Sequence, residues 1–144
     1  MPEPVAVAPI YATGDLRQIL AVEQRQIEDT VADLTDEQMR WRPHPKAKSA
    51  LDILWHLAYS QTQDQPPPSK AAALAAFRQA YDALQAAIAT PEKLDTLVRW
   101  WTGEQIPFRG VVWSEIRHRS YHLGELVYLR QAQGLDEPKY YHEG

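Results

Sequence analysis

The sequence predicts an all-α protein, a four-helix bundle with a short hairpin or extended loop before the last helix. Three observations favour this fold. The 11 prolines are grouped so that they leave long proline-free stretches, apolar residues recur in those stretches at helical spacing, and the links between them are short. A chain of 144 residues is expected to form one domain over 1–144, with peripheral tails at 1–12 and 135–144.

The helices follow in order, each with its own signal. They are expected at about residues 15–33, 50–63, 69–89 and 110–133, with a short helical turn at 36–40. Thr13-Gly14-Asp15 offers a cap and an acid for the first helix, and Ser49 is the expected N-cap of the second. Residues 94–108 lack helical spacing and therefore predict the hairpin or extended loop. Gly134 is expected just after the last helix, as its C′ residue.

The amino-acid composition excludes several classes of function. The chain has no cysteine and five histidines, so disulfides, thiolate metal sites and a cysteine nucleophile are excluded. Any metal must be held by imidazole and oxygen, and any thiol chemistry needs a thiol from outside the chain. A net charge of −4 argues against nucleic-acid binding, and no apolar stretch is long enough for a membrane span. Without the pattern of a signal peptide, a cytoplasmic protein is expected.

Two histidines on the last predicted helix form the clearest candidate site. His118 and His122 are four residues apart and therefore lie on one face, where both can bind one ion. Glu115 and Glu125 lie on the same face, one turn to either side, as candidate bases or orienting groups. Arg119 stands where a zinc metalloprotease needs glutamate, so that class is rejected.

His56, in the middle of the most apolar helix, is the candidate third ligand. A metal site commonly needs three protein ligands, and a bundle can bring a histidine from one helix to a pair on another. Asp52, one turn before His56, could orient its ring or reach the metal. The alternatives remain open at this point: His56 could be a hydrogen-bonded core residue, and the His-x-x-x-His spacing a coincidence.

Other side chains are candidates for substrate binding or for the surface. Trp100 and Trp101 are candidates for a hydrophobic pocket over the metal, with core and loop packing as the simpler reading. Arg119, or else Arg99 or Arg109, could bind a carboxylate substrate. The remaining histidines, His44 between two prolines and His142 in the tail, are expected at the surface.

Two motifs resemble landmarks of the DinB/YfiT-like superfamily. The first is Trp41-Arg42-Pro43-His44-Pro45 followed by Ser49-Ala50-Leu51-Asp52-Ile53-Leu54-Trp55-His56-Leu57. The second is His118-Arg119-Ser120-Tyr121-His122-Leu123-Gly124-Glu125, then Leu129-Arg130 and Gly134. Together they cover roughly residues 10–135 in order and spacing. Leu123 stands where the family usually has arginine, and Glu125 where it usually has glutamine.

This resemblance implies a four-helix bundle with a three-histidine divalent metal site, often homodimeric. The ligands would be His56, His118 and His122, with zinc or nickel favoured and manganese or iron as alternatives. Family members include transferases that use low-molecular-weight thiols such as bacillithiol or mycothiol, a thiol-dependent maleylpyruvate isomerase, and metal-dependent hydrolases. The expected function is therefore metal-dependent transfer of a small thiol to an electrophilic small molecule. Hydrolysis of amides or esters, and a non-catalytic metal-binding bundle linked to stress, are the alternatives.

Overall fold

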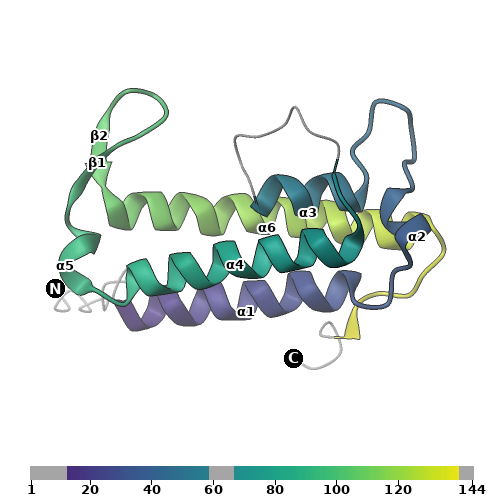
Figure 1. The fold of residues 1–144 in the computed structure, drawn as a ribbon, viewed down its shortest axis with the longest axis horizontal. Helices are drawn as coiled ribbons and strands as arrows, with labels where there is room; N and C mark the ends of the chain where they lie inside the picture. Colours follow the sequence, from purple (N-terminus) through teal and green to yellow (C-terminus); the bar gives the residue numbers. More distant parts are fainter. Residues whose placement is uncertain (1–12, 59–66, 140–144) are drawn as a thin grey trace, which may run out of the picture.

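The computed structural model describes residues 13–58 and 67–139, which form an all-α bundle with one small hairpin (Figure 1). The described elements, in chain order, are α1 (Thr13–Val31), α2 (Asp36–Arg40), α3 (Ala50–Ala58), α4 (Lys70–Ile88), α5 (Pro91–Leu94), β1 (Leu97–Arg99), β2 (Gln105–Pro107) and α6 (Phe108–Ala132). The predicted fold class is confirmed. None of these helices is long and apolar enough to cross a membrane.

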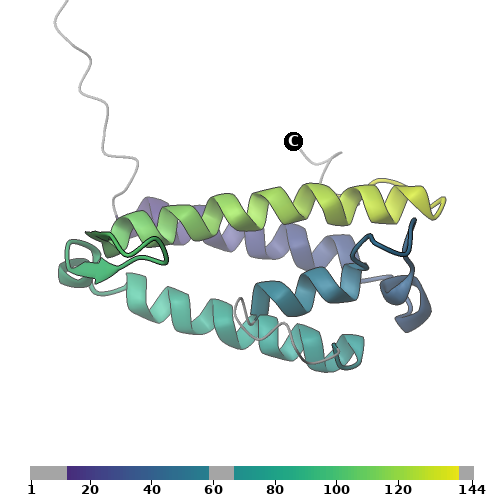
Figure 2. The ribbon, with the colours of Figure 1, turned by 90° about the horizontal axis from the view of Figure 1, so that it is seen from above.

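Four helices, α1, α3, α4 and α6, lie along a common axis and form the bundle. The helix α6 runs its full length, with α1 packed along it and α3 packed on α4 (Figures 1 and 2). In the described part of the chain α3 is short and covers only the half of the bundle next to α2. The hairpin and α5 stand at the opposite end, beside the start of α6. The end of α3 therefore lies over the middle of α6.

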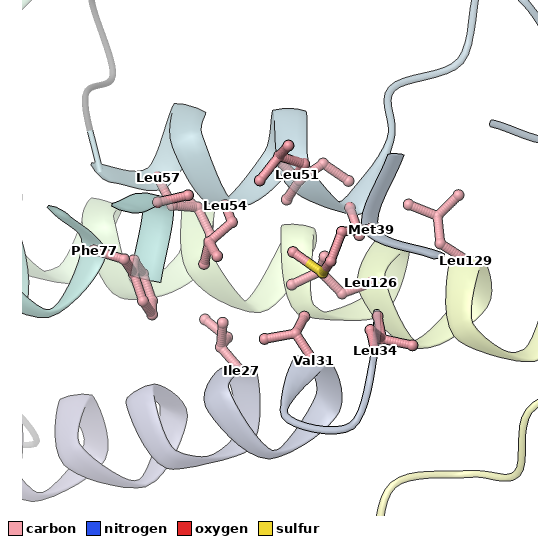
Figure 3. Packing of buried hydrophobic residues seen from close by; sticks show 13 residues of the cluster. Ile27, Val31, Leu34, Met39, Leu51, Leu54, Leu57, Phe77, Leu126 and Leu129 are labelled. Atoms are coloured by element: carbon pink, nitrogen blue, oxygen red, sulfur yellow. The ribbon is translucent and has the colours of Figure 1, made fainter. Parts of the chain in front are cut away.

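The buried apolar residues form two clusters, one at each end of the bundle. The larger one joins α1, α2, α3, α4 and α6, and residues such as Ile27, Leu54, Phe77 and Leu126 point into it from four helices (Figure 3). The second includes Leu16, Leu20, Ile88, Leu94, Val112 and Ile116. Full burial of a side chain of this size stabilises the fold by about 1.5–3 kcal/mol. The larger cluster packs α3 against α6, which positions the site described below.

Hydrogen-bonded caps set several helix ends. Ser49 accepts from the Asp52 backbone N–H at 3.1 Å, while Asp52 Oδ2 accepts from the Ser49 N–H at 2.8 Å. This reciprocal pair confirms Ser49 as the N-cap of α3. After α6, Gly134 has a φ of 85° and donates to Gln131 O at 2.9 Å, and Leu135 N–H donates to Arg130 O. This is the Schellman arrangement, and it confirms Gly134 as the C′ residue.

Some helix bounds differ from the prediction. Thr13-Gly14-Asp15 forms the first turn of α1 instead of a cap before it, and α6 begins at Phe108, two residues early. The short helix α5 was not expected. The predicted end of the second helix, 59–63, lies outside the described residues, as do the tail 1–12 and residues 140–144. The predicted hairpin is confirmed, with Val98 opposite Ile106 and a left-handed Gly103 at the turn.

Candidate metal site and its cavity

Three imidazoles from two helices converge at the middle of the bundle. His56 comes from α3, and His118 and His122 come from consecutive turns of α6. The His118 Nε2 atom lies 2.9 Å from His56 Nε2 and 3.1 Å from His122 Nε2. The rings are nearly perpendicular, at 72–83° to one another. Among the described residues, one ligand atom from each lies within 4.8 Å of the others, a grouping able to hold a metal ion.

Carboxylates face the opposite nitrogens of the two α6 histidines. Glu125 Oε1 lies 2.7 Å from His122 Nδ1, and both atoms are buried without another hydrogen-bond partner in the described structure. Glu115 Oε2 lies 3.7 Å from His118 Nδ1. A carboxylate near Nδ1 favours the proton there and leaves the lone pair on Nε2. Two Nε2 lone pairs would then face each other at 3.1 Å, which is repulsive unless a cation lies between them.

The residues present therefore fit a divalent metal ion. A zinc–nitrogen bond is about 2.0–2.1 Å long, so one ion can contact both nitrogens of pairs this close. Burial lowers the pKa of His56 to about 4, helped by the charges of Lys48, His118 and His122. Burial also lowers the pKa of His122, against the opposing effect of Glu125. Neutral imidazole is the form that binds metal, so these groups are ready to act as ligands at neutral pH.

Asp52 has other contacts than those expected. Its Oδ2 caps α3 through the Ser49 N–H and lies 2.6 Å from the Arg42 guanidinium. These contacts tie the loop before α3 to the start of the helix that carries His56. The helix cap and the ion pair with Arg42 are therefore sufficient to explain why an aspartate stands at this position. A direct role of Asp52 toward His56 or a metal stays a prediction.

Arg119 does not line the substrate pocket, and that prediction is wrong. The side chain is 1% exposed and donates to Gln24 Oε1 of α1 at 2.8 Å. It also donates to Glu115 Oε1 at 3.2 Å and lies over the Phe77 ring at 4.8 Å. One residue along a helix is a rotation of about 100°, which turns Arg119 away from the His118 face and into the bundle. Glu115 is thereby shared between Arg119 and His118.

A cavity of about 720 Å³ opens beside the histidines, between the hairpin and α6. Its apolar lining consists of Val98, Trp100, Trp101, Phe108 and Val111, and its polar lining of Arg99, Ser114, Glu115, His56 and His118. The volume is in the range of small-molecule sites. Trp100 and Trp101 thus lie where the predicted pocket places them, although a substrate role is still a prediction.

Part of this lining was missed from the sequence. Ser114 lies four residues before His118, on the same face of α6, so helical spacing alone could have found it. The remaining histidines are not at the site. His44 lies on the exposed loop before α3 and accepts from the Lys46 N–H at 3.1 Å, as the prediction of a surface position requires. His142 lies outside the described residues.

The fold and site define a class: a helical bundle in which three histidines from two helices meet beside a cavity. Residues 19–64 match the family model of the DinB superfamily. The fold is similar to the crystal structure of a DinB-like protein from Bacillus cereus, with a TM-score of 0.73 and 22% identity over 87% of this chain and 95% of that chain. No curated protein matches the chain. The family model covers less than half of the chain, and the structural match shows a shared fold; both findings agree with the motif resemblance.

Proposed function

We propose that the protein is a divalent-metal-dependent enzyme that transfers a low-molecular-weight thiol to an electrophilic small molecule. The observation that supports it most strongly is the convergence of His56, His118 and His122 at the wall of a cavity of substrate size. Zinc or nickel suits three imidazoles with an open position, and manganese or iron would need further oxygen ligands. Because the chain has no cysteine, the sulfur would arrive with a small molecule.

Each side chain at the site has a distinct task in this proposal. A bound divalent ion supplies Lewis acidity, which lowers the pKa of a coordinated thiol or water. The three imidazoles hold the ion, and Glu125 orients the His122 ring through Nδ1. Only His56 and His118 line the cavity, so reactants approach the ion from their side. Glu115, held by Arg119 and lining the cavity, accepts the proton that the thiol releases.

One observation favours hydrolysis of amides or esters as the second candidate. Glu115 lies in the cavity next to His118, where a carboxylate can act as general base toward a water molecule. The same ion and the same residues would then serve a different nucleophile. The two functions differ in whether a thiol is consumed.

An activity test separates these candidates. The metal-loaded protein is mixed with 1-chloro-2,4-dinitrobenzene and a panel of small thiols, and free thiol is followed over time. The proposal predicts loss of thiol that stops on chelation and in His56→Ala, and that continues in His44→Ala, the matched exposed control. Turnover of an ester or amide panel without thiol would instead support hydrolysis. Inactivity in both assays with the metal bound would support the non-catalytic metal-binding bundle.

The resemblance also leads us to propose a homodimer. Ile19 and Val22 of α1 and Tyr121 and Tyr128 of α6 are exposed apolar or aromatic side chains, at 37–69% exposure, on helices that pack against each other. Light scattering should give twice the chain mass of 16.5 kDa. A mass of one chain at micromolar concentration would contradict this proposal without affecting the metal site.

A further inference from the structure

Three arginines were candidates for binding an anionic substrate group, and the structure distinguishes them. Arg119 is buried against Gln24 and Glu115. Arg109 lies 3.1 Å from Asp95 Oδ1 at the base of the hairpin. Arg99, at the end of β1, is exposed, lines the cavity, and has no ion pair within the described ranges 13–58 and 67–139. Of the three, only Arg99 has a guanidinium at the cavity that is available to an anion.

The cavity next to Arg99 offers flat aromatic surfaces. The rings of Trp100 and Trp101 are 6.4 Å apart and tilted by 53°, and Trp101 is 81% exposed. Phe108 and Val111 extend the apolar lining along the first turn of α6. An exposed tryptophan is unfavourable in water, and a flat ring that stacks on it buries a large area for little loss of side-chain entropy.

We propose that this cavity binds a small molecule that has a planar aromatic group and an anionic group, a carboxylate in the simplest case. The aromatic group lies against Trp100 and Trp101, the anion pairs with Arg99, and the ligand faces His56 and His118. The guanidinium fits a carboxylate through two parallel N–H donors. This inference rests on the proposed function for the reaction, since it names the substrate class of the same site.

Calorimetric titration of the zinc-loaded protein with matched probes tests the proposal. The probes are 2-naphthoate, its neutral amide 2-naphthamide, and cyclohexanecarboxylate, which has the anion without the aromatic ring. We expect 2-naphthoate to bind about tenfold more tightly than either of the other probes, as one charge-assisted contact or one stacked ring allows. Arg99→Gln should remove the difference between 2-naphthoate and 2-naphthamide, and Trp101→Ala should weaken both naphthalenes.

Arg40→Gln is the matched control, because Arg40 is also exposed but lies on α2, at the other end of the bundle. This variant should bind all three probes as the unmodified protein does. The proposal is overturned if 2-naphthoate does not saturate the protein at millimolar concentration, or if Arg99→Gln binds it with unchanged affinity. An equal loss in Arg40→Gln would also overturn it, since the effect would then be one of overall charge.

The same samples separate this inference from the proposed function. Zinc content is measured before each titration and again after chelation. A protein that holds zinc but shows no preference for 2-naphthoate contradicts the inference and leaves the proposed function standing. A protein that prefers 2-naphthoate but holds no zinc supports the inference and contradicts the proposed function.

Discussion

Replacing Glu23 by glutamine is predicted to make the protein more stable above pH 7. Glu23 lies on α1, is 5% exposed, and is hydrogen-bonded to Ser120 of α6, while its Oε1 has no partner among the described residues. Burial raises its pKa from an ordinary 4.5 to about 7. The Ser120 hydrogen bond and the charge of Arg119 lower the pKa in part, and Glu115 raises it. The folded protein therefore holds this carboxyl protonated over a range where the unfolded chain does not.

The magnitude follows from this difference in proton binding. Below pH 4.5 both states are protonated, so the residue has no pH-dependent effect. Between pH 4.5 and about 7 only the folded state keeps the proton, so stability falls as pH rises. Above pH 7 the penalty is complete and amounts to about 3 kcal/mol, at about 1.36 kcal/mol per pKa unit. Glutamine is neutral throughout and can still hydrogen-bond to Ser120, so Glu23→Gln avoids this loss.

Urea unfolding at pH values from 4.5 to 8.5 measures the effect. Both proteins are kept in chelator, so that pH-dependent metal binding does not contribute, and the histidines common to both cancel in the difference. The gap in unfolding free energy should grow with pH and level off above about pH 7. The exposed Glu37→Gln on α2 should change stability by less than about 0.5 kcal/mol throughout. A gap that does not vary with pH, or a less stable Glu23→Gln at pH 8, would refute the reasoning.

Three further predictions concern the core, a helix end and the metal site. Leu54→Ala removes a fully buried side chain and should lower the unfolding free energy by about 2–5 kcal/mol in urea titration; a change below 1 kcal/mol would contradict the packing of α3 on the bundle. Gly134→Ala places a Cβ at a φ of 85°. The resulting strain should lower the unfolding free energy by about 1–2 kcal/mol, which a thermal melt would show as a lower melting temperature. Glu125→Gln should weaken zinc binding about 10–100-fold in chelator competition, because His122 Nδ1 loses its carboxylate partner; full affinity in this variant would show that Glu125 does not orient the ligand.

The bundle could be predicted because proline and helical spacing are strong local signals. The four long helices occupy the stretches between proline clusters, and Ser49 and Gly134 mark two ends. The same use of proline explains one failure. Prolines were expected to separate the helices, yet Pro91 stands at the first position of α5, where its missing N–H has no consequence and its fixed φ suits a helix.

Spacing made His118 and His122 a candidate pair and placed His56 as a candidate third ligand, and the motif resemblance implied that the three histidines form one site. The contacts of the neighbouring polar residues could not be predicted. Arg119 was a candidate because an arginine near the metal could bind a carboxylate substrate, but the residue after His118 on a helix points about 100° away from it. Its partner Gln24 is 95 positions distant in sequence, so only the packing of α1 on α6 shows the pairing. The sequence signal for such a pairing was the presence of polar residues, Glu23 among them, within the apolar stripe of α1, since a buried polar side chain needs a partner.

Metal content tests the central claim most directly. The purified protein is loaded with zinc, passed through a desalting column, and analysed for zinc per chain by elemental analysis. The account predicts one ion per chain, lost in His56→Ala and in His118→Ala and retained in the exposed His44→Ala, with each variant checked for helical content by circular dichroism. Zinc content that is the same in all four folded proteins would contradict the claim that these histidines form a metal site.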